Sequence, residues 1–235
     1  MVGGGLVGLT AAVALRHHGV AVTVVERRAT TSPQPKARRF HVRTMEILRE
    51  LGLADAVHVL ARDLAGHDHM ARGHTLADAT RLPLWPQAGD PAAPISPEQP
   101  CLTAQDLLEP MLRAAAIDAG ADVRFSTELL GFEQSPQGVV GHLRDGDIHA
   151  SYLVAADGAR SGTRAALGIA RSGRGRIGRP SVSVYFHADH AEVVRGPEFN
   201  LCQIEHPNAP GVSECEVSLS NSQVAAQPRT AGGRA

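Results

Sequence analysis

The sequence predicts an α/β protein in which a parallel sheet covered by helices is followed by a β-meander and an incomplete second β-sheet. Three observations lead to this prediction. A glycine-rich turn at residues 3–8 leads into a small-residue helical segment and then into a valine-rich strand. Residues 129–156 contain short strand-like segments separated by turn signals. Residues 181–186 alternate like a strand with one solvent-exposed face.

Length and composition limit the class of protein. The 235 residues suffice for one large or two small domains with a sizeable core. A formal net charge of −1 indicates neither a nucleic acid nor a membrane surface as partner. No apolar run approaches the roughly 20 residues of a membrane-spanning helix, and we expect no secretory signal. The cysteines match no disulfide framework or metal motif, which favours the reducing cytoplasm; they are Cys101, Cys202 and Cys215.

The glycine-rich turn has the spacing G-x-G-x-x-G. Gly3 permits a tight turn, Gly5 lets the backbone approach a pyrophosphate, and Gly8 lets the following helix pack closely on a strand. The helix N-terminus would face the phosphates with free N–H groups and its positive dipole end. The next strand ends at Glu26, whose carboxylate can accept hydrogen bonds from a ribose. We therefore predict a Rossmann-like dinucleotide site, with a glycine-rich turn of another α/β protein as the alternative.

The first strand of this unit is short in the sequence. Only Met1 and Val2 precede the glycine motif, whereas a dinucleotide fold places a strand of about five or six residues there. We expect either that the true start lies upstream or that the chain is a damaged fragment.

A basic stretch follows Glu26. Its cations are Arg27, Arg28, Lys36, Arg38, Arg39 and Arg43. Guanidinium groups pair bidentately with phosphate oxygens, so we predict that at least one of these residues contacts the phosphates of the ligand. A solvated loop is the alternative.

Two further helices are predicted on either side of an irregular segment. Residues 44–51 carry apolar side chains on one face. The second helix follows Thr103, which has capping-box spacing to Asp106, and Pro110 should bend this helix or set its start. Between them, the proline-rich residues 63–100 predict an insertion of strands and loops. Within it, His67 and His69 lack a fixed third ligand, so a polar loop is preferred to a metal site.

The remainder of the nucleotide-binding unit is predicted as a strand at residues 122–125 and a β-meander. The meander segments are 129–134, 139–144 and 149–156. The apolar run at 152–156 is expected to re-enter the buried parallel sheet. It ends at Asp157 and Gly158, and the carboxyl end of a parallel strand is where ligands bind. A simple Asp-Gly turn is the alternative.

With these motifs placed, the chain resembles the single-component FAD-dependent aromatic hydroxylases, the flavoprotein monooxygenases related to para-hydroxybenzoate hydroxylase. The resemblance is strongest to the branch that oxygenates phenols and aromatic polyketides. It rests on the glycine motif with Glu26, on residues 35–53, and on residues 152–161 with their Asp-Gly pair. These features span most of residues 2–168. The family usually has glycine where this chain has Ala155.

The resemblance implies an FAD- and NAD(P)H-dependent monooxygenase that hydroxylates a small phenolic or polyketide-type aromatic molecule. NADPH or NADH would donate electrons, and molecular oxygen would be the co-substrate. The FAD ribose would lie on Glu26 and the pyrophosphate at the glycine turn, while Gln105 would touch FAD and Asp157 would serve nicotinamide binding and flavin positioning. The candidate cofactor-binding residues are Gly3, Gly5, Gly8, Glu26, Arg27, Lys36, Arg38, Arg43, Gln105, Asp157 and Gly158. No catalytic residue is assigned, and no metal ligand is expected.

The same resemblance divides the chain into parts. Residues 1–62 and 101–172 would form the Rossmann-like FAD-binding domain, and residues 63–100 an insertion toward the substrate domain. Residues 173–217 would begin an incomplete substrate domain. Residues 218–235 contain few large apolar side chains and cannot offset their ordering entropy, so we expect a disordered tail there.

The chain also departs from this family. Its members run to several hundred residues and carry a third motif, a Gly-Asp pair before a helix, which we do not find here. We hypothesise a truncated or mispredicted gene product that lacks parts at both ends and is inactive in this form. Two alternatives stay open: an FAD-dependent dehydrogenase or reductase with the same fold, and a non-catalytic remnant that needs a complementing chain. A homo-oligomer also stays open.

Overall fold

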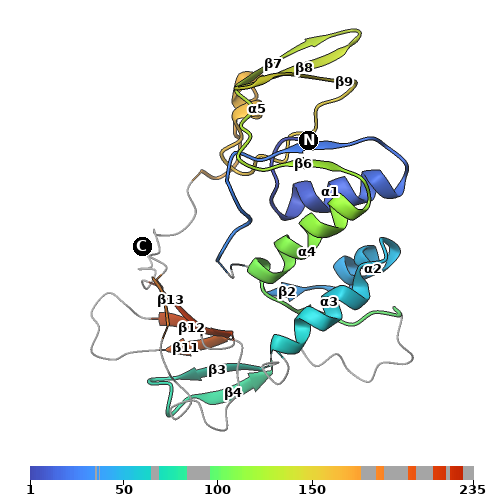
Figure 1. Cartoon of the computed structure of the whole chain (residues 1–235). Helices are drawn as coiled ribbons and strands as arrows, with labels where there is room; N and C mark the ends of the chain where they lie inside the picture. The colour runs from blue at the N-terminus through green and yellow to red at the C-terminus, as the bar shows by residue number, and fades with distance from the viewer. Residues whose placement is uncertain are drawn as a thin grey trace. The chain divides into compact units, whose positions relative to one another are not determined.

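The computed structural model describes residues 1–34, 36, 38–64, 69–83, 96–175, 184–187, 201–204, 214–220 and 223–229 (Figure 1). The chain divides into two units. Unit 1 consists of Met1–Leu60 and Glu98–Gly173, and unit 2 consists of Ala61–Pro97 and Arg174–Ala235. His67 of the predicted polar loop lies outside the described residues, as do residues 181–183 of the predicted strand at 181–186.

Unit 1 is built on short parallel strands. Strand β1 (Thr23–Val25) pairs in parallel with β6 (Asp122–Arg124). Val2 forms parallel bridges to Val25 and to Ala155, so the start of the chain lies between these two segments. The Val2 N–H donates to the Val154 carbonyl at 2.9 Å. Residues 1–3 therefore occupy the place of the first strand that the glycine motif requires.

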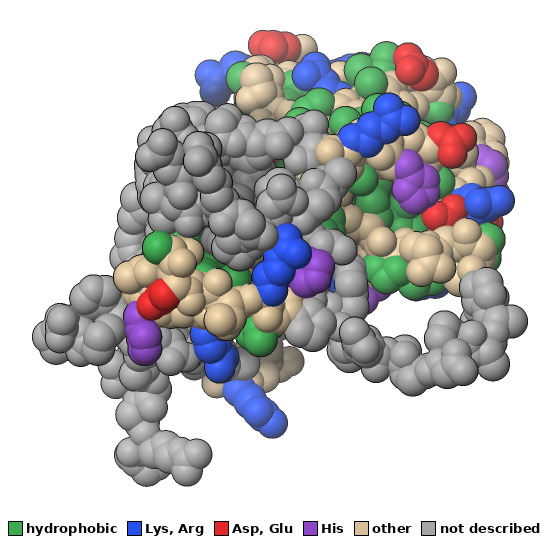
Figure 2. Space-filling view, turned by 90° about the horizontal axis from the view of Figure 1, so that it is seen from below, with side chains coloured by type: hydrophobic (Ala, Val, Ile, Leu, Met, Phe, Trp, Pro, Cys, Tyr) green, Lys and Arg blue, Asp and Glu red, His purple; other side chains and the backbone are tan. Residues whose placement is uncertain are grey.

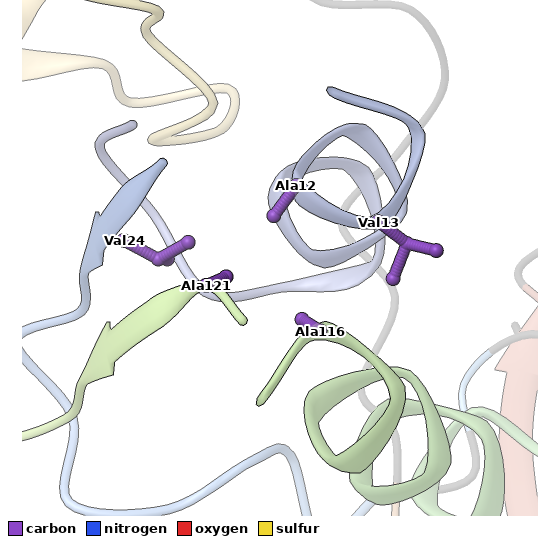
Figure 3. Packing of buried hydrophobic residues seen from close by; sticks show 5 residues of the cluster. All are labelled: Ala12, Val13, Val24, Ala116 and Ala121. Carbon is purple, nitrogen blue, oxygen red and sulfur yellow. The ribbon is translucent and has the colours of Figure 1, made fainter. Parts of the chain in front are cut away.

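Two helices cover this sheet: α1 (Leu6–His17) and α4 (Gln105–Asp118), which lie side by side (Figure 1). Figure 3 shows their packing, in which Ala12 of α1 points toward Val24 of β1 and Ala116 of α4 faces α1. Ala12, Val24 and Ala116 are all fully buried. Alanine on both helices permits the close approach that larger side chains would prevent. This packing fixes the N-terminus of α1 relative to the strand ends.

A smaller layer of unit 1 combines a helical pair with two short strands. Helix α2 (Val42–Glu50) confirms the predicted helix, whereas α3 (Ala54–Ala61), which is followed by the 3₁₀ turn η1 (Arg62–Leu64), was not predicted. Strand β2 (Arg39–Phe40) pairs antiparallel with β5 (Cys101–Leu102).

A buried carboxylate holds the chain where it returns to this layer. Glu98 accepts a hydrogen bond from Arg49 at 3.1 Å, and its second oxygen lies 3.2 Å from His58 Nε2. The hydrogen bond from Arg49 is the main reason that the pKa of Glu98 lies below its usual value, and His58 adds to the effect. These contacts connect Glu98, the first residue of the second segment of unit 1, to α2 and α3.

The start of α4 differs from the predicted capping box. The N-cap is Ala104, and the Thr103 Oγ1 is buried without a hydrogen-bond partner. The Thr103 N–H donates to the Arg38 carbonyl at 3.0 Å, so the residue continues the β2–β5 pairing and lies outside the helix. The helix begins at Gln105 and passes through Pro110, which is exposed near its first turns.

The predicted β-meander is confirmed as β7 (Gly131–Ser135), β8 (Gly138–Leu143) and β9 (Gly146–Ala150), all antiparallel. The prediction of a buried strand at 152–156 is wrong in its burial. The segment does run parallel to Val2, but Tyr152 is 83% exposed and Val154 43% exposed. No described strand pairs with its outer side, so the segment forms an edge of this small sheet.

Unit 2 contains a six-stranded sheet in the order β10-β13-β12-β11-β3-β4. Its strands are β3 (His69–Gly73), β4 (Thr80–Pro83), β10 (Val184–His187), β11 (Leu201–Ile204), β12 (Glu214–Ser220) and β13 (Gln223–Arg229). The pair β3–β11 is parallel and joins the insertion to the later part of the chain, with fully buried Ala71 opposite fully buried Cys202.

The expectation of a disordered tail from residue 218 differs from the structure. Residues 214–220 and 223–229 form an antiparallel hairpin within the six-stranded sheet. Backbone ladder hydrogen bonds do not depend on large apolar side chains, which were the basis of the expectation. Residues 230–235 lie outside the described part of the chain.

Charged side chains of both signs lie on the face of the molecule that Figure 2 shows. In Figure 2, basic and acidic side chains are intermixed on the visible face, in keeping with a net charge of −1. Among the described residues, no helix combines the length and the apolar character that crossing a membrane would require.

Candidate functional site

A pocket of about 470 Å³ opens in unit 1 where the glycine turn meets the carboxyl ends of the strands. This volume falls in the range of small-molecule and cofactor sites. Chain segments that are far apart in the sequence supply its wall, among them the turn itself, the end of β1, and the Asp-Gly pair after residue 156. Its lining includes Gly3, Gly5, Glu26, Arg27, Arg28, Gln105, Glu109, Glu128, Asp157, Gly158, Arg160 and Thr163.

The glycine turn is packed too tightly for side chains at two of its positions. Gly3 has φ +102°, and a Cβ on it would lie 2.7 Å from the Ala156 carbonyl carbon. A Cβ on Gly8 would overlap the Gly3 carbonyl oxygen. The turn therefore folds back on the start of α1 and rests directly on the backbone of residues 156–157.

The N-terminus of α1 opens toward the pocket. Its N-cap is Gly5, which provides no side chain to accept from the first N–H groups of the helix. Leu6 and Val7, the first two helical residues, line the pocket. Free N–H groups and the positive end of the helix dipole make such a terminus suited to an anion such as a phosphate.

Glu26 is fixed at the end of β1 by backbone donors. Its Oε2 accepts from the Gly4 N–H at 2.8 Å, and its Oε1 accepts from the Arg28 N–H at 2.9 Å. A Cβ on Gly4 would lie 2.8 Å from the Glu26 Cβ, so the turn and the acid are in close contact. The carboxylate is half-buried and keeps lone pairs for further donors, such as ribose hydroxyl groups.

Asp157 is held by the helix that follows it. Its Oδ2 accepts from the Thr163 N–H at 3.0 Å and from the Thr163 hydroxyl at 3.1 Å, at the start of α5 (Gly162–Ala166). Burial alone would raise the pKa of Asp157, but hydrogen bonds from Ser161 and Thr163 together hold it below its usual value. The group is therefore an anionic acceptor at the pocket wall.

We expect Asp157→Ala to lower the free energy of unfolding by about 1 kcal/mol at neutral pH, as for the loss of a helix-capping carboxylate. Because the folded-state pKa lies below the unfolded value of about 3.9, this contribution is present above that value and is lost as the pH falls through the folded pKa. Urea unfolding at neutral and acidic pH checks this. The difference in the free energy of unfolding between wild type and variant should disappear below about pH 4. A difference that does not change with pH would contradict the stabilising role of the ionised Asp157 carboxylate. Asp118→Ala, at an exposed position, serves as the control.

A buried polar group lies beneath the glycine turn. Glu109 is 4% exposed and lines the pocket from α4. Its Oε1 accepts from Gln105 Nε2 at 2.6 Å, and its Oε2 accepts from the Ser32 N–H at 2.7 Å. A Cβ on Gly5 would lie 3.9 Å from the Glu109 Oε1. The group links helix α4, the loop after β1 and the turn.

The structure brings most of the predicted site residues together. Those that line the pocket are Gly3, Gly5, Glu26, Arg27, Gln105, Asp157 and Gly158, and Gly8 packs directly behind the turn.

Three predicted cations are not among the lining residues of this pocket. Lys36 is exposed, and Arg43 is exposed and pairs with Glu46 at 3.0 Å. Arg38 is only 7% exposed and lies near Asp106, whose pKa burial raises in spite of this cation. Arg28 and Arg160, which were not among the candidate cofactor-binding residues, do line the pocket.

Sequence reasoning missed Glu109 and Thr163. Glu109 lies four residues after Gln105, the spacing that places two side chains on one helix face, so the pair could have been found from periodicity. Thr163 pairs with Asp157 across the intervening turn, and no spacing rule indicates such a contact.

Comparison with known proteins identifies the family. Residues 1–231 match the model of the FAD binding domain. The chain belongs to this FAD-binding domain family. This match and the similar proteins described next confirm the predicted resemblance to flavin-dependent hydroxylases and the predicted α/β FAD-binding fold.

Similar proteins include the tetracenomycin B2 monooxygenase-dioxygenase of Streptomyces olivaceus, 38% identical over 232 residues, which cover 90% of this chain and 43% of that protein. A putative polyketide hydroxylase of Streptomyces halstedii is 40% identical over 220 residues, with 90% and 40% covered. The structure is also similar to aklavinone-11 hydroxylase in a ternary complex with FAD and aklavinone. The TM-score is 0.84 at 34% identity, with 99% of this chain and 46% of that chain covered. The chain thus spans about two fifths of the length of these curated relatives.

Proposed function

We propose that this chain carries the FAD site of an NAD(P)H-dependent monooxygenase that hydroxylates a phenolic or polyketide-type aromatic molecule. One observation carries the proposal: the glycine turn, Glu26 and the Asp157-Gly158 pair, which lie far apart in the sequence, line one pocket. The names of the similar proteins, a monooxygenase-dioxygenase and a polyketide hydroxylase, support the reaction class.

The residues of the pocket fit a flavin dinucleotide. The open N-terminus of α1 suits its pyrophosphate, and Glu26 can accept hydrogen bonds from its adenosine ribose. Arg27, Arg28 and Arg160 supply positive charge at the pocket wall. The lack of a Cβ at Gly5 leaves the backbone open to the ligand, and a side chain there would narrow the pocket.

When bound, FAD supplies the redox chemistry, with NADPH or NADH as the electron source and molecular oxygen as the co-substrate. The residues of this chain bind and orient it. Asp157 is an anionic acceptor positioned by Thr163 at the wall of the pocket. Cys101 and Cys202 are buried and are not joined in a disulfide within the described part of the chain, and a reducing compartment such as the cytoplasm belongs to the proposal.

The reaction class is tested with labelled oxygen. The sequence alone indicates a gene product that is inactive in this form, so the assay decides between that hypothesis and the proposed function. The proposed function predicts that the FAD-loaded protein, supplied with NADPH and a phenolic polyketide under ¹⁸O₂, gives a product that carries one labelled oxygen atom. The control omits FAD and should give no product. Oxidation of NADPH that proceeds at the same rate without oxygen, and yields unlabelled product, would favour the dehydrogenase or reductase alternative.

A further inference from the structure

The pocket contains one buried carboxylate whose role the proposed FAD site does not itself explain. Glu109 lies on α4 and is 4% exposed. It is placed next to the N-terminus of α1, where we propose that an anionic pyrophosphate binds. A second negative charge at this place weakens the attraction for a phosphate. A carboxylate at this place therefore needs a role that offsets its unfavourable effect on phosphate binding.

The two hydrogen bonds of Glu109 indicate that role. An ionised carboxylate can only accept hydrogen bonds, so Gln105 must turn its NH₂ group toward Glu109 Oε1, where the distance is 2.6 Å. An unrestrained glutamine amide can rotate by half a turn and exchange its donor and acceptor ends. The carboxylate selects one of these orientations. The Gln105 carbonyl oxygen and its second N–H are then the groups left for a ligand of the pocket.

The other oxygen of Glu109 binds the loop that follows β1. It accepts from the N–H of Ser32, a residue that is 6% exposed, at 2.7 Å. Ser32 belongs to the loop that begins with Arg27 and Arg28, and both arginines line the pocket. One side chain therefore fixes the backbone of the arginine loop and the amide of Gln105 at the same time.

We propose that Glu109 is a positioning residue of the FAD site, which sets the orientation of the Gln105 amide that FAD meets. This inference rests on the proposed function, because it assumes that FAD is the ligand. Glu109 acts through Gln105, and direct contact with FAD is not required.

The decisive variant is Glu109→Gln, which keeps shape and removes the charge. The new amide can still accept from the Ser32 N–H, but its NH₂ group then faces the NH₂ group of Gln105. Gln105 must rotate, which restores the hydrogen bond and presents the opposite end of its amide to the pocket. We expect the thermal unfolding midpoint of the FAD-free protein to stay near wild type, while the Kd for FAD rises about tenfold, as for the loss of one hydrogen bond between the Gln105 amide and the ligand.

A double-mutant cycle tests whether Glu109 acts through Gln105. In a Gln105→Ala background, Glu109→Gln should no longer weaken FAD binding, because the amide that Glu109 orients is gone. Glu50→Gln is the charge-matched control; Glu50 is exposed at the end of α2, outside the pocket lining, so the loss of its negative charge should leave the Kd for FAD unchanged. FAD binding is followed by quenching of flavin fluorescence.

Each outcome decides the proposal. An equal loss of affinity in both backgrounds, or no loss in either, would overturn it. A fall in the unfolding midpoint of Glu109→Gln that accounts for the weaker binding would show a structural role only and would also overturn it. If the wild-type chain binds no FAD, both the proposed function and this inference fail. If the wild type and the Glu109→Gln variant bind FAD with the same Kd, the inference alone is overturned.

Discussion

Replacing Gly8 with alanine is expected to abolish retention of FAD and to lower the free energy of unfolding by at least about 2 kcal/mol, the range of overpacked sites. The added Cβ would overlap the Gly3 carbonyl oxygen and reach 3.4 Å from the Ala156 Cβ. The first of these is a backbone atom of the turn and cannot move aside as a side chain would. The turn must therefore open, which displaces the N-terminus of α1 from the pocket.

Urea unfolding and flavin absorbance after desalting measure the two effects of Gly8→Ala. Gly162→Ala is the control for the stability measurement alone, because Gly162 lies in a helix and a Cβ there would meet no protein atom within 4 Å. Its place in the pocket lining excludes it as a control for FAD retention. The control should be neutral or slightly stabilising, since alanine is the better helix former. A Gly8→Ala protein that keeps both stability and FAD would contradict the close turn described above.

The second large effect is expected for Ala116→Leu, at about 3 kcal/mol of lost stability. Ala116 is fully buried where α4 faces α1, in the cluster that includes Ala12 and Val24 (Figure 3). A leucine would force the two helices apart. Because α1 carries the glycine turn, FAD affinity should fall together with stability.

Ala114→Leu provides the matched control for this substitution. Ala114 lies on the exposed face of the same helix, where the same change in volume should alter stability by less than about 0.5 kcal/mol. Both variants are compared by urea unfolding followed by circular dichroism. Equal stability of the two variants would contradict the view that the α1–α4 contact positions the site.

The parts of the site set by local spacing were predictable from the sequence. The glycine turn, helix α1 and Glu26 follow one another within a short stretch, and each has a physical requirement that only certain residue types meet. The Asp-Gly pair could be placed because turn signals divide the meander. Its contact with Thr163 depends on the path of the chain through the next turn, which no periodicity encodes.

Charge composition was a weaker guide than spacing. The basic stretch after Glu26 predicted cations at the phosphates, but packing decides which of these side chains reach the pocket. Arg38 is buried beside Asp106, and Arg43 pairs with Glu46 on α2. Arg28, from the same stretch, lines the pocket because the Glu26 carboxylate accepts from its N–H and so fixes its position.

Long-range pairing accounts for the rest of what the sequence could not show. Strand β3 pairs with β11, and Arg72 donates to Gln203 Oε1 at 2.8 Å across more than a hundred residues of chain. The hairpin β12–β13 likewise forms from a segment with few large apolar side chains. The sequence predicts Thr103 as a helix cap, but its N–H donates a hydrogen bond to the Arg38 carbonyl, outside the helix.

The central claim, that the Gly3–Glu26 segment and the Asp-Gly pair form an FAD site in this chain, is tested most directly by one measurement. The purified chain is incubated with excess FAD and desalted, and its visible absorption spectrum is recorded together with circular dichroism of the same sample. We predict a folded protein that retains flavin absorbance in a stoichiometric amount. A folded protein that elutes without flavin would contradict the claim.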